Sequence, residues 1–166
     1  MNQPTIMLRR NLVIQAGGYN EKLSVSEDYE MWTRLASITK LSNIPEYLVR
    51  YRQHDNNISK LIESNYYHVV TSRKFIKSLL NIDISVNILL FLRSKTEHHS
   101  TNPFVSYFAA YSLLKIYTAF LRKFCLTPTQ RVILRNYLRS NIRSIVIASD
   151  YKLLLSPLLI IRYLVY

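Results

Sequence analysis

The stretch that decides the expected fold is Gly17–Trp32, which reads GGYNEKLSVSEDYEMW. It holds both glycines of the chain, side by side, and two adjacent acidic residues, Glu27 and Asp28, ten residues later. Glycine readily adopts the left-handed conformation that ends a helix, so Gly17 predicts the end of a short helix over residues 10–16. A second helix is expected to start at Glu27, because the helix dipole stabilises ionised carboxylates in a first turn.

Asp28 is the candidate catalytic residue of this stretch. An ionised carboxylate at the mouth of a cleft can take a proton from a hydroxyl group, and a glycine pair lets a ligand approach the backbone closely. Trp32 follows four residues later on the same helix face, where its ring either stacks on a sugar or fills the core. Acidic residues at helix starts more often only stabilise the helix, so this spacing alone is a weak indication of catalysis.

The composition of the 166-residue chain favours a mostly helical globular protein. Hydrophobic residues make up 49% of it and charged residues 19%, which excludes intrinsic disorder. Two glycines are too few for the many tight turns of a β-sandwich or barrel, and one cysteine excludes a disulfide framework or a cysteine-rich zinc site. A half-buried strand is nevertheless expected over residues 47–52, YLVRYR, from their alternation with period two.

Charge divides the chain into two regions. Residues 1–60 carry eight lysines and arginines against six acidic residues, whereas residues 61–166 carry fourteen against four. The second region is expected to be helical, and its apolar spacing predicts the following segments: 61–99 with a break at 81–85, 104–124, and 129–149, before an apolar tail.

A row of arginines recurs every four residues in the last expected helix, with apolar residues alongside: Arg131, Arg135, Arg139 and Arg143, next to Leu134, Leu138, Ile142 and Ile145. We interpret this helix as interfacial, its arginines meeting anionic lipid while its leucines and isoleucines enter the acyl boundary. A solvated basic face over a helical core explains the pattern equally well. Nucleic acid is the rival partner for this basic region, and we do not expect it, because no nucleic-acid-binding motif is present.

Several blocks of the first sixty residues occur in a fixed order: PTIMLRR (4–10), GGYNE (17–21), SEDYEMWTRL (26–35), NIPE (43–46) and YRQH (51–54). In this order they resemble the C-terminal portion of the catalytic domain of glycosyltransferase family 2, over about residues 3–60. The resemblance implies an α+β fold. Residues 1–60 would form the C-terminal part of a Rossmann-like GT-A domain, and residues 61–166 a mostly helical tail.

The resemblance also implies roles for individual residues. Gly17, Gly18 and Tyr19 match the glycine loop that borders the acceptor site of this family. Asp28 matches the general base of its inverting members, which deprotonates the acceptor hydroxyl as that oxygen attacks the anomeric carbon and displaces a nucleoside diphosphate. Glu27 would help to orient the acceptor.

The metal and diphosphate side of the family's site is represented only in part. His54 matches a histidine that helps to bind the metal or the diphosphate, and Arg52 is a further candidate for the diphosphate. The family's Asp-x-Asp motif, which holds Mg²⁺ or Mn²⁺, has no counterpart, because the aspartates stand at positions 28, 55, 83 and 150. The resemblance therefore implies a fragment that is inactive alone and works with a separate N-terminal glycosyltransferase portion.

The function implied by the resemblance is transfer of a sugar from a nucleotide-sugar donor to a glycan or lipid-linked acceptor, in the synthesis of cell-envelope polysaccharide or glycolipid. The expected location is the cytoplasmic face of the membrane, with peripheral contact and no nucleic-acid partner. The alternative is a non-catalytic helical module for membrane-surface or protein interaction.

Overall fold

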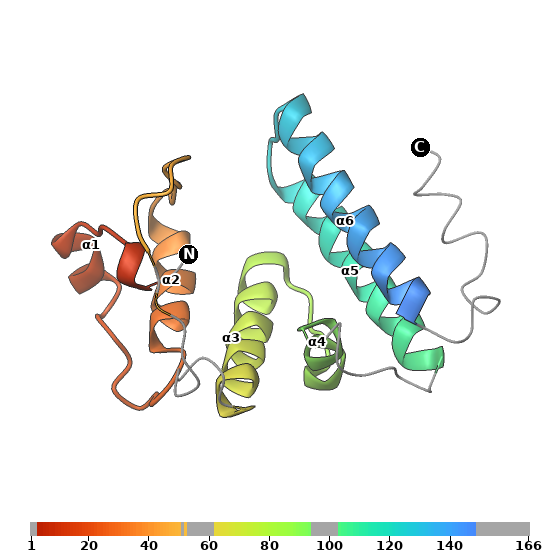
Figure 1. Cartoon of the computed structure of the whole chain (residues 1–166), viewed down its shortest axis with the longest axis horizontal. Coiled ribbons are helices and arrows are strands. Elements are labelled where there is room, and N and C mark those ends of the chain that lie inside the picture. The colour runs from red at the N-terminus through yellow and green to blue at the C-terminus, as the bar shows by residue number, and fades with distance from the viewer. Residues whose placement is uncertain (1–2, 51, 53–61, 94–102, 149–166) are drawn as a thin grey trace. The chain divides into compact units, whose positions relative to one another are not determined.

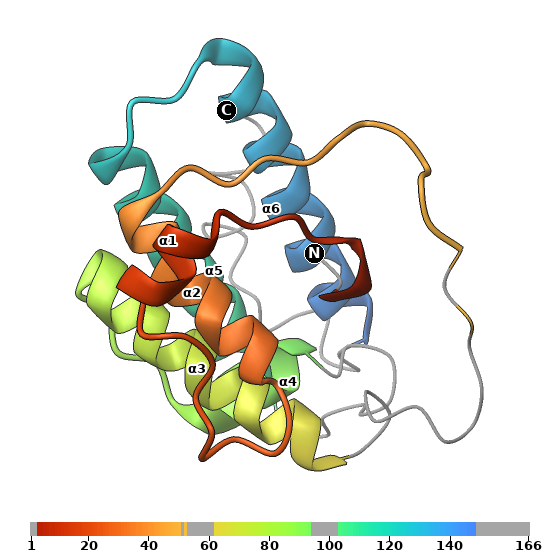
Figure 2. The same cartoon turned by 90° about the vertical axis from the view of Figure 1, so that its left-hand side faces the viewer.

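The computed structural model describes residues 3–50, 52, 62–93 and 103–148. Figures 1 and 2 show the chain from two directions, and it divides into two compact units, Met1–Phe75 and Ile76–Tyr166. The elements in chain order are a short 3₁₀ turn η1 (Gln3–Thr5), α1 (Arg10–Gln15), α2 (Glu27–Ile38), α3 (Ile62–Leu80), α4 (Val86–Arg93), α5 (Pro103–Lys123) and α6 (Pro128–Ala148).

The expected α+β fold is wrong, because helices make up 69% of the described residues and none of them forms a strand. A strand is held by hydrogen bonds to a neighbouring strand, and the described residues offer no such neighbour. Residues 47–50 run as irregular chain, and the side chains of Tyr47 and Leu48 are 108% and 65% exposed. The alternation that predicted a half-buried strand therefore has no buried face, and a Rossmann-like portion is not present in the described residues.

The end of α1 forms as the glycine pair predicts. Gly17 and Gly18 have φ angles of 87° and 68°. The Gly18 N–H donates to the Val13 carbonyl and the Gly17 N–H to the Ile14 carbonyl, both at 2.9 Å. These two bonds make a Schellman motif, which satisfies carbonyls that the end of a helix otherwise leaves without partners.

In the N-terminal unit, α2 packs against α1 and supplies the buried side chains. Met31 and Leu35 are 0% and 1% exposed, and Val25, just before α2, is also buried. Between the two helices, residues 19–26 descend in Figure 1 from the end of α1 to the start of α2. The start of α2 at Glu27 agrees with the prediction.

In the C-terminal unit, α5 packs against both α4 and α6. The turn between α5 and α6 ends in a capping box, in which the Thr127 N–H donates to Gln130 Oε1 at 2.9 Å and the Gln130 N–H donates to Thr127 Oγ1 at 3.3 Å. Because this connection is short, α5 and α6 form an antiparallel hairpin, visible in Figure 1. The expected helices and the break before α4 are confirmed over the described residues, whereas residues 61, 94–99 and 149 of the expected segments, and the apolar tail, lie outside them.

A small apolar core joins the two helices of the hairpin. Leu114 of α5 packs with Leu138 and Ile142 of α6, and Leu113 and Tyr117 cover this cluster. Ile145 is buried as well. The interpretation that the leucine and isoleucine row of α6 enters lipid is therefore wrong for Leu138, Ile142 and Ile145, because α5 already covers that face.

Candidate functional site

The side chain of Arg34 ties the glycine turn (residues 16–18) to α2. Its Nη2 donates to the Gly18 carbonyl at 2.7 Å, and its Nη1 donates to the Ala16 carbonyl. The same guanidinium donates from Nε and Nη2 to the two oxygens of Glu30, at 2.9 and 2.8 Å. Glu30 precedes Arg34 by one helical turn, so α2 presents a bidentate ion pair whose remaining donors bind backbone carbonyls of the turn.

Backbone conformation, not lack of space, favours glycine at both positions of the turn. A Cβ on Gly17 would lie 3.5 Å from Arg34 Nη1, an ordinary van der Waals contact, so its φ of 87° is what strains any other residue there. A Cβ on Gly18 would meet nothing within 4 Å, and its φ of 68° is likewise the constraint. The left-handed Gly17 belongs to the Schellman motif, which gives it a structural role beside the acceptor-binding role expected from the sequence.

The first turn of α2 carries three carboxylates, those of Glu27, Asp28 and Glu30. Asp28 is half-buried, and its Oδ1 accepts a hydrogen bond of 2.6 Å from the Tyr29 N–H. At 100° per residue, Glu27 shares the face of Glu30 and Arg34, whereas Asp28 lies about 120° around the helix from Arg34 and about 9 Å along its axis. The structure thus brings the glycine turn to Arg34 and Glu30, while Asp28 lies on a different face of α2.

Two predicted substrate-binding side chains frame this region. Trp32 is half-buried, and its indole Nε1 is buried without a hydrogen-bond partner among the described residues. Tyr19 is 43% exposed, and its hydroxyl accepts a hydrogen bond from the Gln3 side-chain amide. Trp32 therefore contributes part of its ring to the interior, and Tyr19 stands on the surface beside the turn.

Two links that hold this part together are not indicated by any local sequence pattern. The first joins Tyr29 to α3: its hydroxyl lies 2.9 Å from Ser72 Oγ, and its ring lies 4.6 Å from the ring of His68, tilted by 44°. The second is the bond from Arg34 to the glycine turn. The i,i+4 spacing of Glu30 and Arg34 predicts their ion pair, but no local pattern predicts a partner forty-three residues away.

The residues expected on the metal and diphosphate side are not assembled in the described part. Arg52 is exposed, and His54 lies outside the described residues. No group of three or more His, Cys, Asp or Glu side chains that could hold a metal ion occurs in the described ranges.

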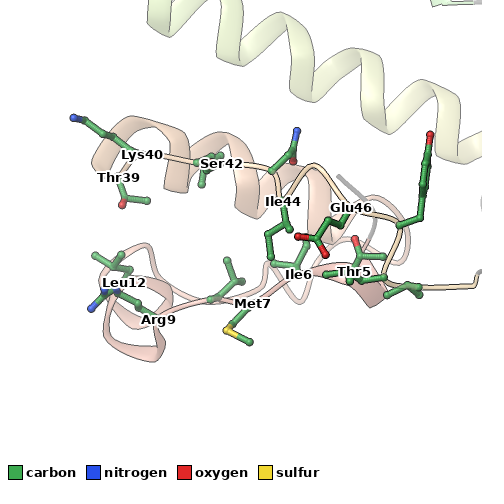
Figure 3. Close-up of a pocket in the computed structure, with 16 residues that line it drawn as sticks. Thr5, Ile6, Met7, Arg9, Leu12, Thr39, Lys40, Ser42, Ile44 and Glu46 are labelled. Atoms are coloured by element: carbon green, nitrogen blue, oxygen red, sulfur yellow. The ribbon is translucent and has the colours of Figure 1, made fainter.

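An open hollow of about 540 Å³ lies elsewhere in the N-terminal unit. Figure 3 shows it between the segment before α1 and the segment after α2, with Arg9 and Leu12 toward one end and Thr5 and Glu46 toward the other. Met7, Ile44 and Tyr47 line it and are largely exposed. None of the predicted catalytic or substrate-binding residues lines this hollow, so it is not the predicted site.

Comparisons of the chain with protein-family models, with curated proteins and with solved structures find no match. The resemblance to glycosyltransferase family 2 therefore rests on the sequence blocks between residues 3 and 60. The geometry adds one fact to those blocks: the second and the third of them, GGYNE and SEDYEMWTRL, are joined by the side chain of Arg34.

Proposed function

We propose that this chain supplies the acceptor side of a sugar-transfer site of the glycosyltransferase family 2 type. The observation that carries the proposal is the bond from Arg34 to the glycine turn, because it links the two sequence blocks on which the acceptor site depends. A turn held by a charged side chain on the helix that carries the candidate base keeps a fixed position relative to that base.

In this proposal Asp28 acts as the general base. Its carboxylate takes the proton of the acceptor hydroxyl, the hydroxyl oxygen forms a bond to the anomeric carbon, and the bond from that carbon to the nucleoside diphosphate breaks. Glu27 accepts a hydrogen bond from the acceptor and orients it. The position of Asp28, half-buried in the first turn of α2, supports this assignment, because a carboxylate interacts favourably with the N-terminus of a helix.

The acceptor in this proposal is a glycan or a lipid-linked sugar, as the resemblance to glycosyltransferase family 2 implies. The nucleotide-sugar donor is bound by a separate N-terminal glycosyltransferase portion, which supplies Mg²⁺ or Mn²⁺, and the cytoplasmic face of the membrane is the proposed location.

The test is to express the chain together with an N-terminal glycosyltransferase portion and to measure transfer of labelled sugar to membrane glycans and lipids. We expect transfer only when both polypeptides are present, and we expect Asp28→Ala to abolish it. Glu21→Ala is the matched control, because it removes an exposed carboxylate from the connection that leads into α2. Transfer by the N-terminal portion alone, or equal transfer by the two variants, would contradict the proposal.

A further inference from the structure

The outer face of α5 carries a stripe of exposed aromatic side chains. Phe104, Phe108 and Tyr111 are 69%, 51% and 49% exposed, and their spacing of four and three residues places them on one face. Lys115, four residues further, is exposed on the same face. We call Phe104, Phe108 and Tyr111 the aromatic stripe. It faces away from Leu114 and Tyr117, which contact α6.

The exposed side of α6 has two different flanks. At 100° per residue from the buried Leu138, one flank carries Arg135, Arg139 and Arg143, which we call the arginine flank. The opposite flank carries Ile133 and Tyr137, which are 63% and 66% exposed. The two flanks lie on opposite sides of the hairpin.

The arginine flank lies on the same side of the hairpin as the aromatic stripe. Viewed along α5 from its N-terminus, residues advance clockwise around α5 and counterclockwise around the antiparallel α6. Measured from the line that joins the two helices, the aromatic stripe lies about 100–160° around α5, and the arginine flank about 60–140° around α6. Both therefore point to one side, and Ile133 and Tyr137 point to the other.

The charge of the hairpin is of one sign. Residues 103–148 contain seven lysines and arginines and no aspartate or glutamate.

α5 also exposes much of its apolar surface. Among the described helices, Phe104–Lys123 is long and apolar enough by composition to cross a membrane. Only 22% of its most apolar 18-residue stretch is buried. The hairpin therefore combines exposed apolar side chains with charges that are all positive. Its complement is a partner that is apolar and negatively charged.

We propose that this side of the α5–α6 hairpin binds an anionic lipid bilayer in the plane of its interface. The rings of the aromatic stripe enter the boundary between headgroups and acyl chains, and the arginine flank contacts lipid phosphates. A surface for single-stranded nucleic acid also combines aromatic and basic residues, but its rings serve as stacking platforms along a polar backbone-binding groove. Here the three rings lie along one face of a helix that is long and apolar enough to cross a membrane, which favours lipid.

The proposal goes beyond sugar transfer and does not depend on it, so its test requires no enzyme activity. The full chain is sedimented with vesicles of phosphatidylcholine that contain about 30% of the anionic lipid phosphatidylglycerol. A second set of vesicles contains phosphatidylcholine alone. We expect binding to the anionic vesicles that weakens as salt is raised. Phe104→Gln/Phe108→Gln should lower the partition coefficient by about tenfold or more.

The matched control is Ile133→Gln/Tyr137→Gln, which removes two apolar side chains of similar exposure from the opposite flank. We expect this pair to bind within about twofold of the unmodified chain. Arg135→Gln/Arg143→Gln should weaken binding to anionic vesicles by about tenfold. Lys22→Gln/Lys40→Gln, with the same loss of charge in the N-terminal unit, should have little effect.

Several outcomes would overturn the proposal. The first is an equal loss of vesicle binding for a test pair and its control, and the second is equally strong binding to neutral and anionic vesicles. The third is a single-stranded RNA that binds more tightly than the vesicles and whose binding the Phe104→Gln/Phe108→Gln pair abolishes. The helical circular dichroism of every variant is measured first. Should the glutamine pair lose helicity, Phe104→Ala/Phe108→Ala gives the same comparison, because alanine is the strongest helix former.

Discussion

Two pairs of consecutive helices in this chain differ in what joins them. α1 and α2 bury Met31 and Leu35 and are joined in addition by a polar link, in which Arg34 binds two backbone carbonyls and the Glu30 carboxylate. α5 and α6 are held by an apolar cluster around Leu114 and Leu138. An apolar cluster gives stability with little directional demand, whereas charged hydrogen bonds fix the position of particular groups. The first arrangement suits a site, and the second suits a scaffold.

The largest effect is expected in the hairpin. Leu138→Ala removes a buried side chain from the cluster with Leu114 and Ile142, and it should lower the free energy of unfolding by about 2–5 kcal/mol. Urea denaturation followed by helical circular dichroism measures this change. Val132→Ala on the exposed side of α6 should cost about 0.5 kcal/mol or less. Similar costs for the two variants would mean that the apolar cluster does not hold the hairpin.

Breaking the polar link should lower stability by less, and only around the turn. Arg34→Gln removes the bidentate pair with Glu30 and the donors to Ala16 and Gly18, for a loss of about 1–3 kcal/mol of local stability. Hydrogen exchange at the Gly17 and Gly18 amides should become faster. Lys40→Gln, which removes an exposed charge after α2, is the control. Unchanged exchange at both glycines would show that Arg34 does not hold the turn.

The glycine turn should tolerate only residues that accept a positive φ. Gly17→Ala puts alanine at a φ of 87°, and we expect a loss of about 1–2 kcal/mol. Gly17→Asn should be milder, because asparagine tolerates the left-handed region. Thermal unfolding of the two variants gives the comparison. An Asn variant less stable than the Ala variant would contradict this view of the turn.

The smallest effect is expected at the cap of α6. Thr127→Ala removes the acceptor for the Gln130 N–H and should cost about 1 kcal/mol. Thr127→Ser keeps a hydroxyl and should retain most of the stability, which urea denaturation can check. If the alanine and serine variants unfold at the same urea concentration, the capping bond contributes nothing to the hairpin.

Local signals predicted the elements that depend on neighbouring residues. The glycine pair predicted the end of α1, the acidic residues predicted the start of α2, and Thr127 with Pro128 marks the turn of the hairpin. The strand expected over residues 47–52 could not be predicted from such local signals. A strand exists only through a neighbour, and alternating side chains say nothing about whether one is present.

The roles of the candidate site residues stay predictions, and their arrangement could not be predicted from the sequence. The glycine pair lies in the turn that Arg34 binds, but Arg34 and Glu30 were not among the predicted site residues. The bonds from Arg34 reach carbonyls sixteen and eighteen residues earlier, and such contacts depend on how α1 packs against α2. Periodicity also placed Leu138 and Ile142 on one face of α6 but did not reveal that α5 covers it.

The central claim is that Asp28 is a general base and not merely a charge at the start of a helix. The direct measurement is the ratio of kcat for the unmodified chain and Asp28→Asn, each combined with the N-terminal glycosyltransferase portion, at saturating acceptor. Asparagine keeps the shape and removes the proton acceptor, so kcat should fall by about 10²–10⁴ while KM for the nucleotide sugar changes little. A variant that keeps nearly normal kcat would contradict the claim and leave Asp28 as a helix-terminal charge.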